Sequence, residues 1–236
     1  MKKYNDTWVE KIRTDHYHTI RNEASPFGYK VVQFGPPRTG TTVVHQILCT
    51  LMRESTKTHS PIGVIDFEPD FWICTVRDPR DTICSHWRVD NNVNLENYKQ
   101  IKMEKKHIDY YYNAYVHYFK LYEAYINKSN VIWLKYEDYY NNFDNIFDKL
   151  STKMNIDIDK NLRDQIKKEH SLDKNKTFSN DYKSFKEYDN NDLSGLHGNH
   201  IFKGTPGSWE LLVSEQQHEY MDNIFEQYLT AWNYNE

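Results

Sequence analysis

The chain has 236 residues, of which 38% are hydrophobic and 27% charged, and a formal net charge of −4 at pH 7. This length suits one α/β domain and is too short for two ordinary domains with a linker, so we expect a single domain over residues 1–236. So small a net charge gives no overall basic field that would draw the chain to nucleic acid or to an anionic membrane.

The N-terminal region and the cysteines bear on the compartment. Residues 1–28 form a polar leader without the apolar run of about seven or more residues that a signal peptide carries, and no later segment has the roughly 18 apolar residues of a membrane span. Cys49, Cys74 and Cys84 are odd in number and lack CxxC spacing, which favours reduced thiols over disulfides or zinc. We expect a cytoplasmic protein that binds neither nucleic acid nor membrane.

Three short apolar runs alternate with helical segments, the pattern of a parallel sheet covered by helices on both faces. The runs are residues 31–34, 71–76 and 131–134, and each ends in a motif of polar residues or glycine. Because ligands bind at the carboxyl ends of parallel strands, these motifs are expected to share one site. Helices are expected at residues 41–52, 80–88, 95–126, 138–153, 160–170 and 214–232.

Residues 171–202 are dominated by Asp, Asn, Lys, Ser and Gly, with scattered aromatic residues. A stretch of this length without secondary structure inside a compact domain usually belongs to a functional lid or is partly disordered. We therefore expect a mobile lid over these residues.

The first apolar run leads into a phosphate-binding loop. Residues 31–42 read VVQFGPPRTGTT, in which a strand stops at a glycine turn and restarts as the opening of a helix. Backbone N–H groups and the positive end of the helix dipole then point at one anion. Gly35 and Gly40 have the glycine spacing of a P-loop, but Thr41 replaces its lysine and Arg38 supplies a cation inside the loop. We expect phosphate binding without a Walker A motif.

Four further segments follow in order. Residues 57–61 read KTHSP, residues 77–81 RDPRD with Ser85 shortly after, residues 136–138 YED and residues 203–209 KGTPGSW. With the loop, they resemble the sulfotransferases that use 3′-phosphoadenosine 5′-phosphosulfate (PAPS), over residues 31–209. The resemblance implies the P-loop-like sulfotransferase fold, a three-layer α/β structure. It also implies transfer of a sulfuryl group from PAPS to a hydroxyl or amine of a small molecule, with release of 3′-phosphoadenosine 5′-phosphate (PAP) and no required metal.

The resemblance assigns roles at the transfer centre. Arg38 would neutralise the departing phosphate, Lys57 would contact the sulfuryl group, and His59 would act as the base that accepts the proton of the acceptor hydroxyl. Because other branches of the family use a carboxylate base, Asp66 and Glu68 are reserve candidates. The cradle for the 5′-phosphosulfate would consist of Arg38, Thr39, Gly40, Thr41 and Thr42.

The resemblance also assigns the rest of the nucleotide site. Arg77 and Ser85 would hold the 3′-phosphate, and Tyr136 would contact the adenine. Lys203 and Gly204 would close over the 3′-phosphate. Trp209 would lie near the adenine or pack beneath the loop. The chain departs from the family at three of these places: Phe202 stands where an arginine usually precedes the Lys-Gly pair, Val43 stands where a tryptophan stacks, and Ser208 replaces a common aspartate.

Two alternatives share parts of this pattern. A P-loop kinase or NTPase would need the missing lysine and an acidic magnesium ligand at a strand end, whereas the second run ends in Arg77. A magnesium requirement would separate the two classes. A non-catalytic PAP-binding protein would have no need of Arg38, Lys57 and His59 together. The identity of the acceptor and the oligomeric state do not follow from the sequence.

Overall fold

The fold is built on one mixed β-sheet. The structure, a computed structural model, describes residues 9–13, 17–62, 64–182, 185, 195–198 and 200–234. Within these residues the strand order is β1-β2-β4-β3-β5-β6. Strands β4, β3, β5 and β6 are mutually parallel, β2 pairs antiparallel with β4, and β1 pairs antiparallel with β2. The strands are β1 Val9–Arg13, β2 Tyr17–Asn22, β3 Phe27–Phe34, β4 Met52–Thr58, β5 Phe71–Val76 and β6 Val131–Lys135.

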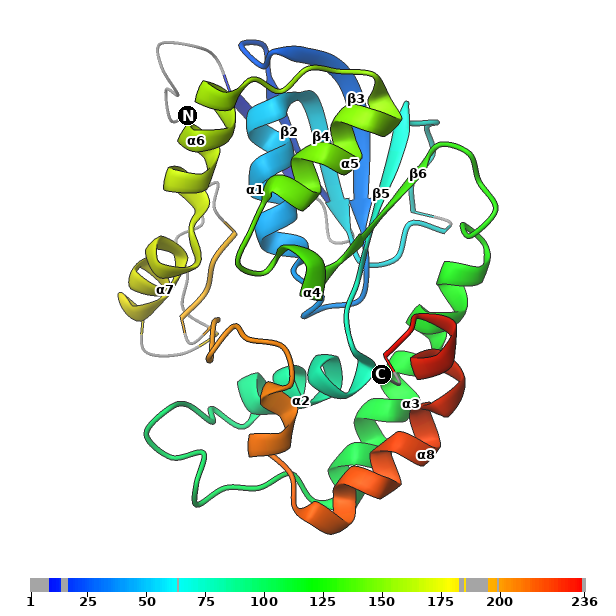
Figure 1. Cartoon of the computed structure of the whole chain (residues 1–236), viewed down its shortest axis with the longest axis vertical. Helices are drawn as coiled ribbons and strands as arrows, with labels where there is room; N and C mark the ends of the chain where they lie inside the picture. The colour runs from blue at the N-terminus through cyan, green and yellow to red at the C-terminus, as the bar shows by residue number, and fades with distance from the viewer. Residues whose placement is uncertain are drawn as a thin grey trace.

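Helices cover both faces of the sheet and its carboxyl edge. In Figure 1, α1 and α5 lie across one face, whereas α2, α3 and α8 gather beyond the carboxyl ends of the parallel strands. The helices are α1 Thr41–Leu51, α2 Pro79–Asp90, α3 Lys105–Glu123, α4 Tyr136–Tyr139, α5 Asp144–Met154, α6 Lys160–His170, α7 Leu172–Asn180, the 3₁₀ helix η1 Ser208–Leu211 and α8 Glu215–Ala231.

Alternation along the strands divides the core in two, because successive side chains of a strand point to opposite faces. On β3, Val31 packs among the apolar residues of α1 and α5, and its neighbour Val32 packs among those of α2, α3 and α8. Tyr125, just after α3, contacts the sheet through Phe34 and Trp72, with ring centroids 4.5 and 5.1 Å away. The α/β fold with a largely parallel sheet between helical layers is as predicted.

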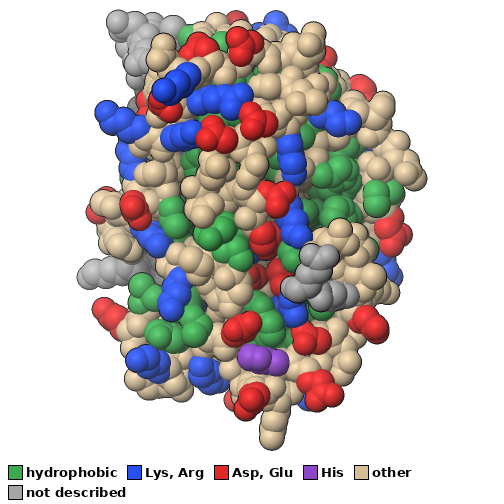
Figure 2. Space-filling view, in the orientation of Figure 1, with side chains coloured by type: hydrophobic (Ala, Val, Ile, Leu, Met, Phe, Trp, Pro, Cys, Tyr) green, Lys and Arg blue, Asp and Glu red, His purple; other side chains and the backbone are tan. Residues whose placement is uncertain are grey.

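The outer surface carries both signs of charge. Figure 2 shows lysine and arginine side chains interspersed with acidic ones on the face that it draws. Between α5 and α6, Lys167 pairs with Asp144 at 2.7 Å and Arg163 pairs with Asp148 at 2.7 Å. No helix among the described residues is long and apolar enough to cross a membrane.

Several element boundaries differ from the prediction. The long helix expected from residue 95 begins at Lys105, because Asn94 and Asn97 exchange side-chain bonds with the local backbone and hold a turn. The helix expected at residues 138–153 is two helices, α4 and α5, with Asn142 accepting from the Asp144 amide between them. Strands β1 and β2 lie within the expected leader, of which residues 1–8 and 14–16 fall outside the described residues.

The range 171–202 is not uniformly irregular. Its first part forms α7, whose side chains face the cavity described below. Residues 183, 184, 186–194 and 199 of this range lie outside the described residues. The expected mobility of the range stays a prediction.

Candidate functional site

A cavity of about 220 Å³ lies at the carboxyl ends of the parallel strands, between the loop after β3, the start of α2, the start of α4 and the chain after α7. It collects most of the residues predicted from the motifs. Those that line it are Arg38, Gly40, Thr41, Thr42, Lys57, His59, Arg77, Ser85, Tyr136, Phe202 and Gly204. The sequence motifs therefore meet in one place, as expected for the carboxyl edge of a parallel sheet.

Close contacts require both glycines of the phosphate loop. A Cβ on Gly35 would lie 2.3 Å from the Thr75 hydroxyl, and a Cβ on Gly40 would lie 2.4 Å from the Tyr139 hydroxyl. Gly40 also has φ +80°, in the left-handed region, and is the residue at which α1 begins. No described side chain caps α1, so its first backbone N–H groups remain available to an anion at the cavity wall.

Thr39 differs from its neighbours in the loop. It is buried, and its hydroxyl is within 2.8 Å of the Pro36 carbonyl and 2.9 Å of the Thr75 hydroxyl. The side chain therefore fastens the loop to β5 and does not line the cavity. Of the expected cradle hydroxyls, those of Thr41 and Thr42 belong to residues of the cavity wall.

Arg38 reaches across the cavity from a strained backbone position. Its φ is +74°, a conformation that non-glycine residues seldom adopt. Its Nε donates to Ser85 Oγ at 3.1 Å, and its Nη2 donates to the His200 carbonyl. Burial lowers the pKa of Arg38 to about 10, and the charge of nearby Arg77 acts in the same direction. In this structure the guanidinium thus lies against α2.

Lys57, at the end of β4, lies beside the start of α1. Its Nζ donates to Thr42 Oγ1 at 3.0 Å. Burial, together with the positive charge of Arg38, lowers the pKa of Lys57 to about 8. Two cations near one uncapped helix N-terminus make this end of the cavity a site for a multiply charged anion.

His59 follows β4 and has a defined tautomer. Its Nδ1 lies 2.8 Å from the Gly35 carbonyl oxygen, which can only accept, so Nδ1 carries the proton and Nε2 keeps its lone pair. Burial lowers the pKa of His59 to about 4, and the charge of Lys57 acts in the same direction. The imidazole is neutral at pH 7, with Nε2 able to accept a proton. The reserve carboxylates, Asp66 and Glu68, are exposed and do not line the cavity.

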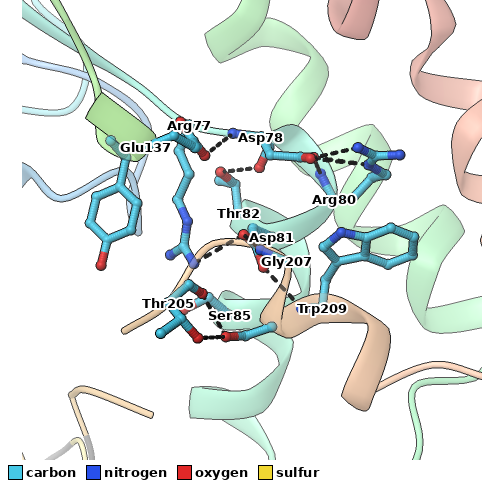
Figure 3. Close-up of polar contacts among 12 residues, drawn as sticks. Arg77, Asp78, Arg80, Asp81, Thr82, Ser85, Glu137, Thr205, Gly207 and Trp209 are labelled. Carbon is cyan, nitrogen blue, oxygen red and sulfur yellow. Dashed lines mark hydrogen bonds and ion pairs between the residues drawn. The ribbon is translucent and has the colours of Figure 1, made fainter. Parts of the chain in front are cut away.

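Asp81 joins the start of α2 to the C-terminal loop, as Figure 3 shows. Its carboxylate accepts from the backbone N–H of Gly207 at 2.8 Å and of Trp209 at 2.9 Å, and it pairs with Arg77 Nη2 at 3.4 Å. The preceding residue, Arg80, bonds to Asp78, which caps α2, and to Asp222 of α8.

Arg77 is held from several sides at the end of β5. Besides Asp81, its Nη1 donates to the Arg38 carbonyl at 3.2 Å, and its guanidinium lies 4.5 Å from the ring centre of Tyr136. Its buried Nε has no hydrogen-bond partner in the described structure. The Tyr136 hydroxyl donates to the Gly204 carbonyl at 2.7 Å, so this ring ties β6 to the C-terminal loop.

The C-terminal loop, residues 202–209, has some residues that line the cavity and others that do not. Phe202, Gly204 and Trp209 line the cavity, and a Cβ on Gly204 would lie 2.9 Å from Leu172 of α7. Lys203 does not line it, because its ammonium group lies over the ring of Tyr98, 5.9 Å from the centre. The predicted closure of Lys203 over a ligand is therefore not present in this arrangement.

Among the residues of the cavity wall that the sequence motifs did not indicate are Arg88 and His200. Arg88 is fully buried on α2, and His200 contributes the carbonyl that Arg38 contacts. Arg88 follows Ser85 by three residues, so a helical reading of α2 places both on one face. The position of His200 depends on contacts distant in sequence, such as its backbone N–H to Ser179 Oγ at 2.9 Å.

Residues 57–233 match the model of the sulfotransferase domain family, a range that begins after the phosphate loop. No curated protein matches the chain in sequence. Among solved structures, the chain resembles mouse sulfotransferase SULT7A1 complexed with PAP, at 15% identity and a TM-score of 0.54, over 86% of this chain and 85% of that chain.

A retinol dehydratase structure in complex with androsterone and PAP has 14% identity and a TM-score of 0.57, over 94% of this chain and 90% of that chain. A second retinol dehydratase structure, with retinol and PAP, has 15% identity at the same TM-score and coverage. Identities this low speak for the fold alone, whereas the family match extends from the Lys57 segment through the C-terminal loop. The chain therefore belongs to the sulfotransferase domain family.

Proposed function

We propose that the protein transfers a sulfuryl group from PAPS to a hydroxyl or amine group of a small acceptor and releases PAP. The observation that carries the proposal is the grouping, around one cavity, of an uncapped helix N-terminus, four cationic side chains and a neutral histidine whose Nε2 can accept a proton. The structures with similar folds contain PAP, which supports a nucleotide of this kind. The androsterone and retinol of the two retinol dehydratase complexes support a small-molecule acceptor.

The proposed chemistry is an in-line displacement at sulfur. A bond forms between the acceptor oxygen and sulfur while the bond from sulfur to the bridging oxygen of the 5′-phosphate breaks, leaving PAP. His59 Nε2 takes the acceptor proton, and Lys57 offsets negative charge on the transferred group. Arg38 neutralises the departing phosphate, which requires its guanidinium to leave Ser85.

The acidic groups of the site favour this reaction over phosphoryl transfer assisted by magnesium. Asp81 is the one carboxylate among the described residues of the cavity wall. Two backbone N–H groups and Arg77 already engage it. A metal ligand would have to give up those contacts, so a kinase or NTPase finds little support here.

The direct test compares nucleotides that differ only in the 3′-phosphate. We expect PAP to bind more tightly than 5′-AMP in titration calorimetry, because Arg77 and Ser85 offer donors to the extra phosphate. Consumption of PAPS should then depend on an added acceptor and persist in EDTA. Equal affinities for the two nucleotides would remove the donor assignment. A screen of hydroxylated acceptors, with a crystal soaked in PAP, would define the second substrate.

A further inference from the structure

Arg88 is a charged side chain in a fully buried position on α2, 0% exposed to solvent. Arginine is rarely buried completely unless its charge is compensated. Its Nη1 donates to the Val93 carbonyl at 3.0 Å and its Nη2 to the His200 carbonyl at 3.2 Å. Its guanidinium also lies 5.5 Å from the ring centre of Phe202. Arg88 is also one of the residues that line the cavity.

Three guanidinium groups meet at this wall. Arg38 and Arg88 both donate through Nη2 to the same carbonyl oxygen of His200, and Arg77 donates to the backbone carbonyl of Arg38. The shared carbonyl is a single neutral acceptor, whereas a phosphate dianion offers charge and several acceptors. Burial lowers the pKa of Arg88 to about 9, and the charges of Arg38 and Arg77 act in the same direction.

Ser85 connects Arg88 to the expected position of the 3′-phosphate. The two residues are three apart on α2 and therefore lie on the same helix face. In this structure Arg38 donates a hydrogen bond to the Ser85 hydroxyl. Under the proposed function Arg38 moves toward the 5′-phosphosulfate, which frees the space between Ser85, Arg77 and Arg88.

Building on the proposed function, we propose that Arg88 is a second arginine ligand of the donor's 3′-phosphate. The phosphate accepts from the Ser85 hydroxyl once Arg38 has moved away. Arg88 then donates to the phosphate and no longer to the His200 carbonyl. Arg88 thereby becomes a specificity-determining residue, because it donates to the 3′-phosphate, the one group that distinguishes PAP from 5′-AMP. Phe202, which lies beside the Arg88 guanidinium, also lines the cavity.

The test is the ratio of affinities for PAP and 5′-AMP, measured by calorimetry in matched variants. Arg88→Met should weaken PAP binding about 10- to 100-fold, the range expected for loss of a charged hydrogen bond, and leave 5′-AMP binding within about twofold. Arg163→Met, which removes an arginine paired with Asp148 on the outer surface, should leave the ratio unchanged. The double variant Arg88→Met with Phe202→Arg should regain preference for PAP, because it returns a guanidinium to the subsite.

The possible outcomes separate the assignment from the proposed function. Wild-type protein that does not distinguish PAP from 5′-AMP overturns both. A wild-type preference that survives in Arg88→Met, or equal weakening of both nucleotides, overturns the assignment alone and leaves Arg88 as a packing residue. If Arg88→Met lacks a cooperative melting transition, Arg88→Lys decides: it keeps the charge without the fork, and a preference equal to that of wild type overturns the assignment.

Discussion

A single hydrogen bond sets the tautomer of His59, the proposed base. The Gly35 carbonyl fixes the proton on Nδ1 and leaves Nε2 as an acceptor. Burial and Lys57 lower the pKa of His59 to about 4, which makes the free enzyme's imidazole a weak base. A bound donor would bring negative charge to Lys57 and Arg38 and so raise the pKa of His59. The base would then be strongest in the complex that needs it.

We predict that His59→Gln abolishes transfer and leaves PAP affinity nearly unchanged, since the imidazole acts on the acceptor. In the wild type, kcat at saturating PAPS should fall as the pH drops through the pKa of His59 in the donor complex. That pKa should lie above about 4, because the negative charge of the donor favours the protonated imidazole. Rate measurements from pH 4.5 to 8, with PAP calorimetry on the variant as control, check this. Activity within a few-fold of wild type would move the base to Asp66 or Glu68.

The site residues that the sequence predicted share one property: each belongs to a short motif, and the resemblance of these motifs to the sulfotransferase family implies a role for it. Arg38, Lys57 and His59 could be found in this way. The partners of these side chains could not. They depend on how segments distant in sequence pack together. Examples are the contact of Arg38 with Ser85, the pairing of Asp81 with Arg77, and the burial of Arg88.

Among the secondary-structure elements, β4 shows why periodicity failed where it did. Its sequence, MRESTKT, carries polar residues on both faces, so no apolar alternation marks a strand. Several of its polar side chains are nevertheless buried and paired: Thr56 contacts Thr19 of β2 at 2.8 Å, and Ser55 contacts His45 of α1 at 3.1 Å. Polar strands of this kind can be recognised only when their partners are known. The apolar strands β3, β5 and β6 were predictable because their patterns are local.

The segment after α6 remains our candidate for a lid. Leu172 and Asn175 of α7 line the cavity, and His200 closes it from the other end of the range. We predict that PAP slows amide hydrogen exchange in residues 172–182 and 195–202, because ligand contacts would offset the ordering entropy of a largely polar stretch. Amides of α8, none of whose residues lines the cavity, are the control. Strong protection in the free protein that PAP does not change would identify a fixed wall of the pocket.

For the molecule as a whole, several buried histidines should make stability depend on pH. Burial lowers the pKa of His170 to about 4 and that of His200 well below its ordinary value. Such histidines bind protons more readily in the unfolded chain, whose pKa is about 6.5. Their contribution is therefore complete above about pH 6.5 and is lost as the pH falls toward the folded value. Asp81 and Glu137, whose pKa burial raises, act in the opposite sense.

We predict that the free energy of unfolding falls more steeply between pH 7 and pH 5 in the wild type than in His170→Gln. The difference should be at most about 1.4 kcal/mol per pH unit, the value for one titrating group. Urea unfolding at several pH values measures it, and His117→Gln, at an exposed position on α3, provides the control. Parallel pH dependences for wild type and His170→Gln would show that His170 is not buried in its neutral form.

The contacts of Asp81 also bear on how the chain folds while it is being made. Arg38, Lys57 and Arg77 are synthesised long before Gly207 and Trp209, whose backbone N–H groups supply two of the three contacts of the Asp81 carboxylate. A nascent chain that lacks this loop leaves the Asp81 carboxylate without two of its three contacts, and only Arg77 still pairs with it. Because a ligand stabilises only the states that bind it, nucleotide in the cell would not rescue early translation intermediates and would act on chains that have already made the loop.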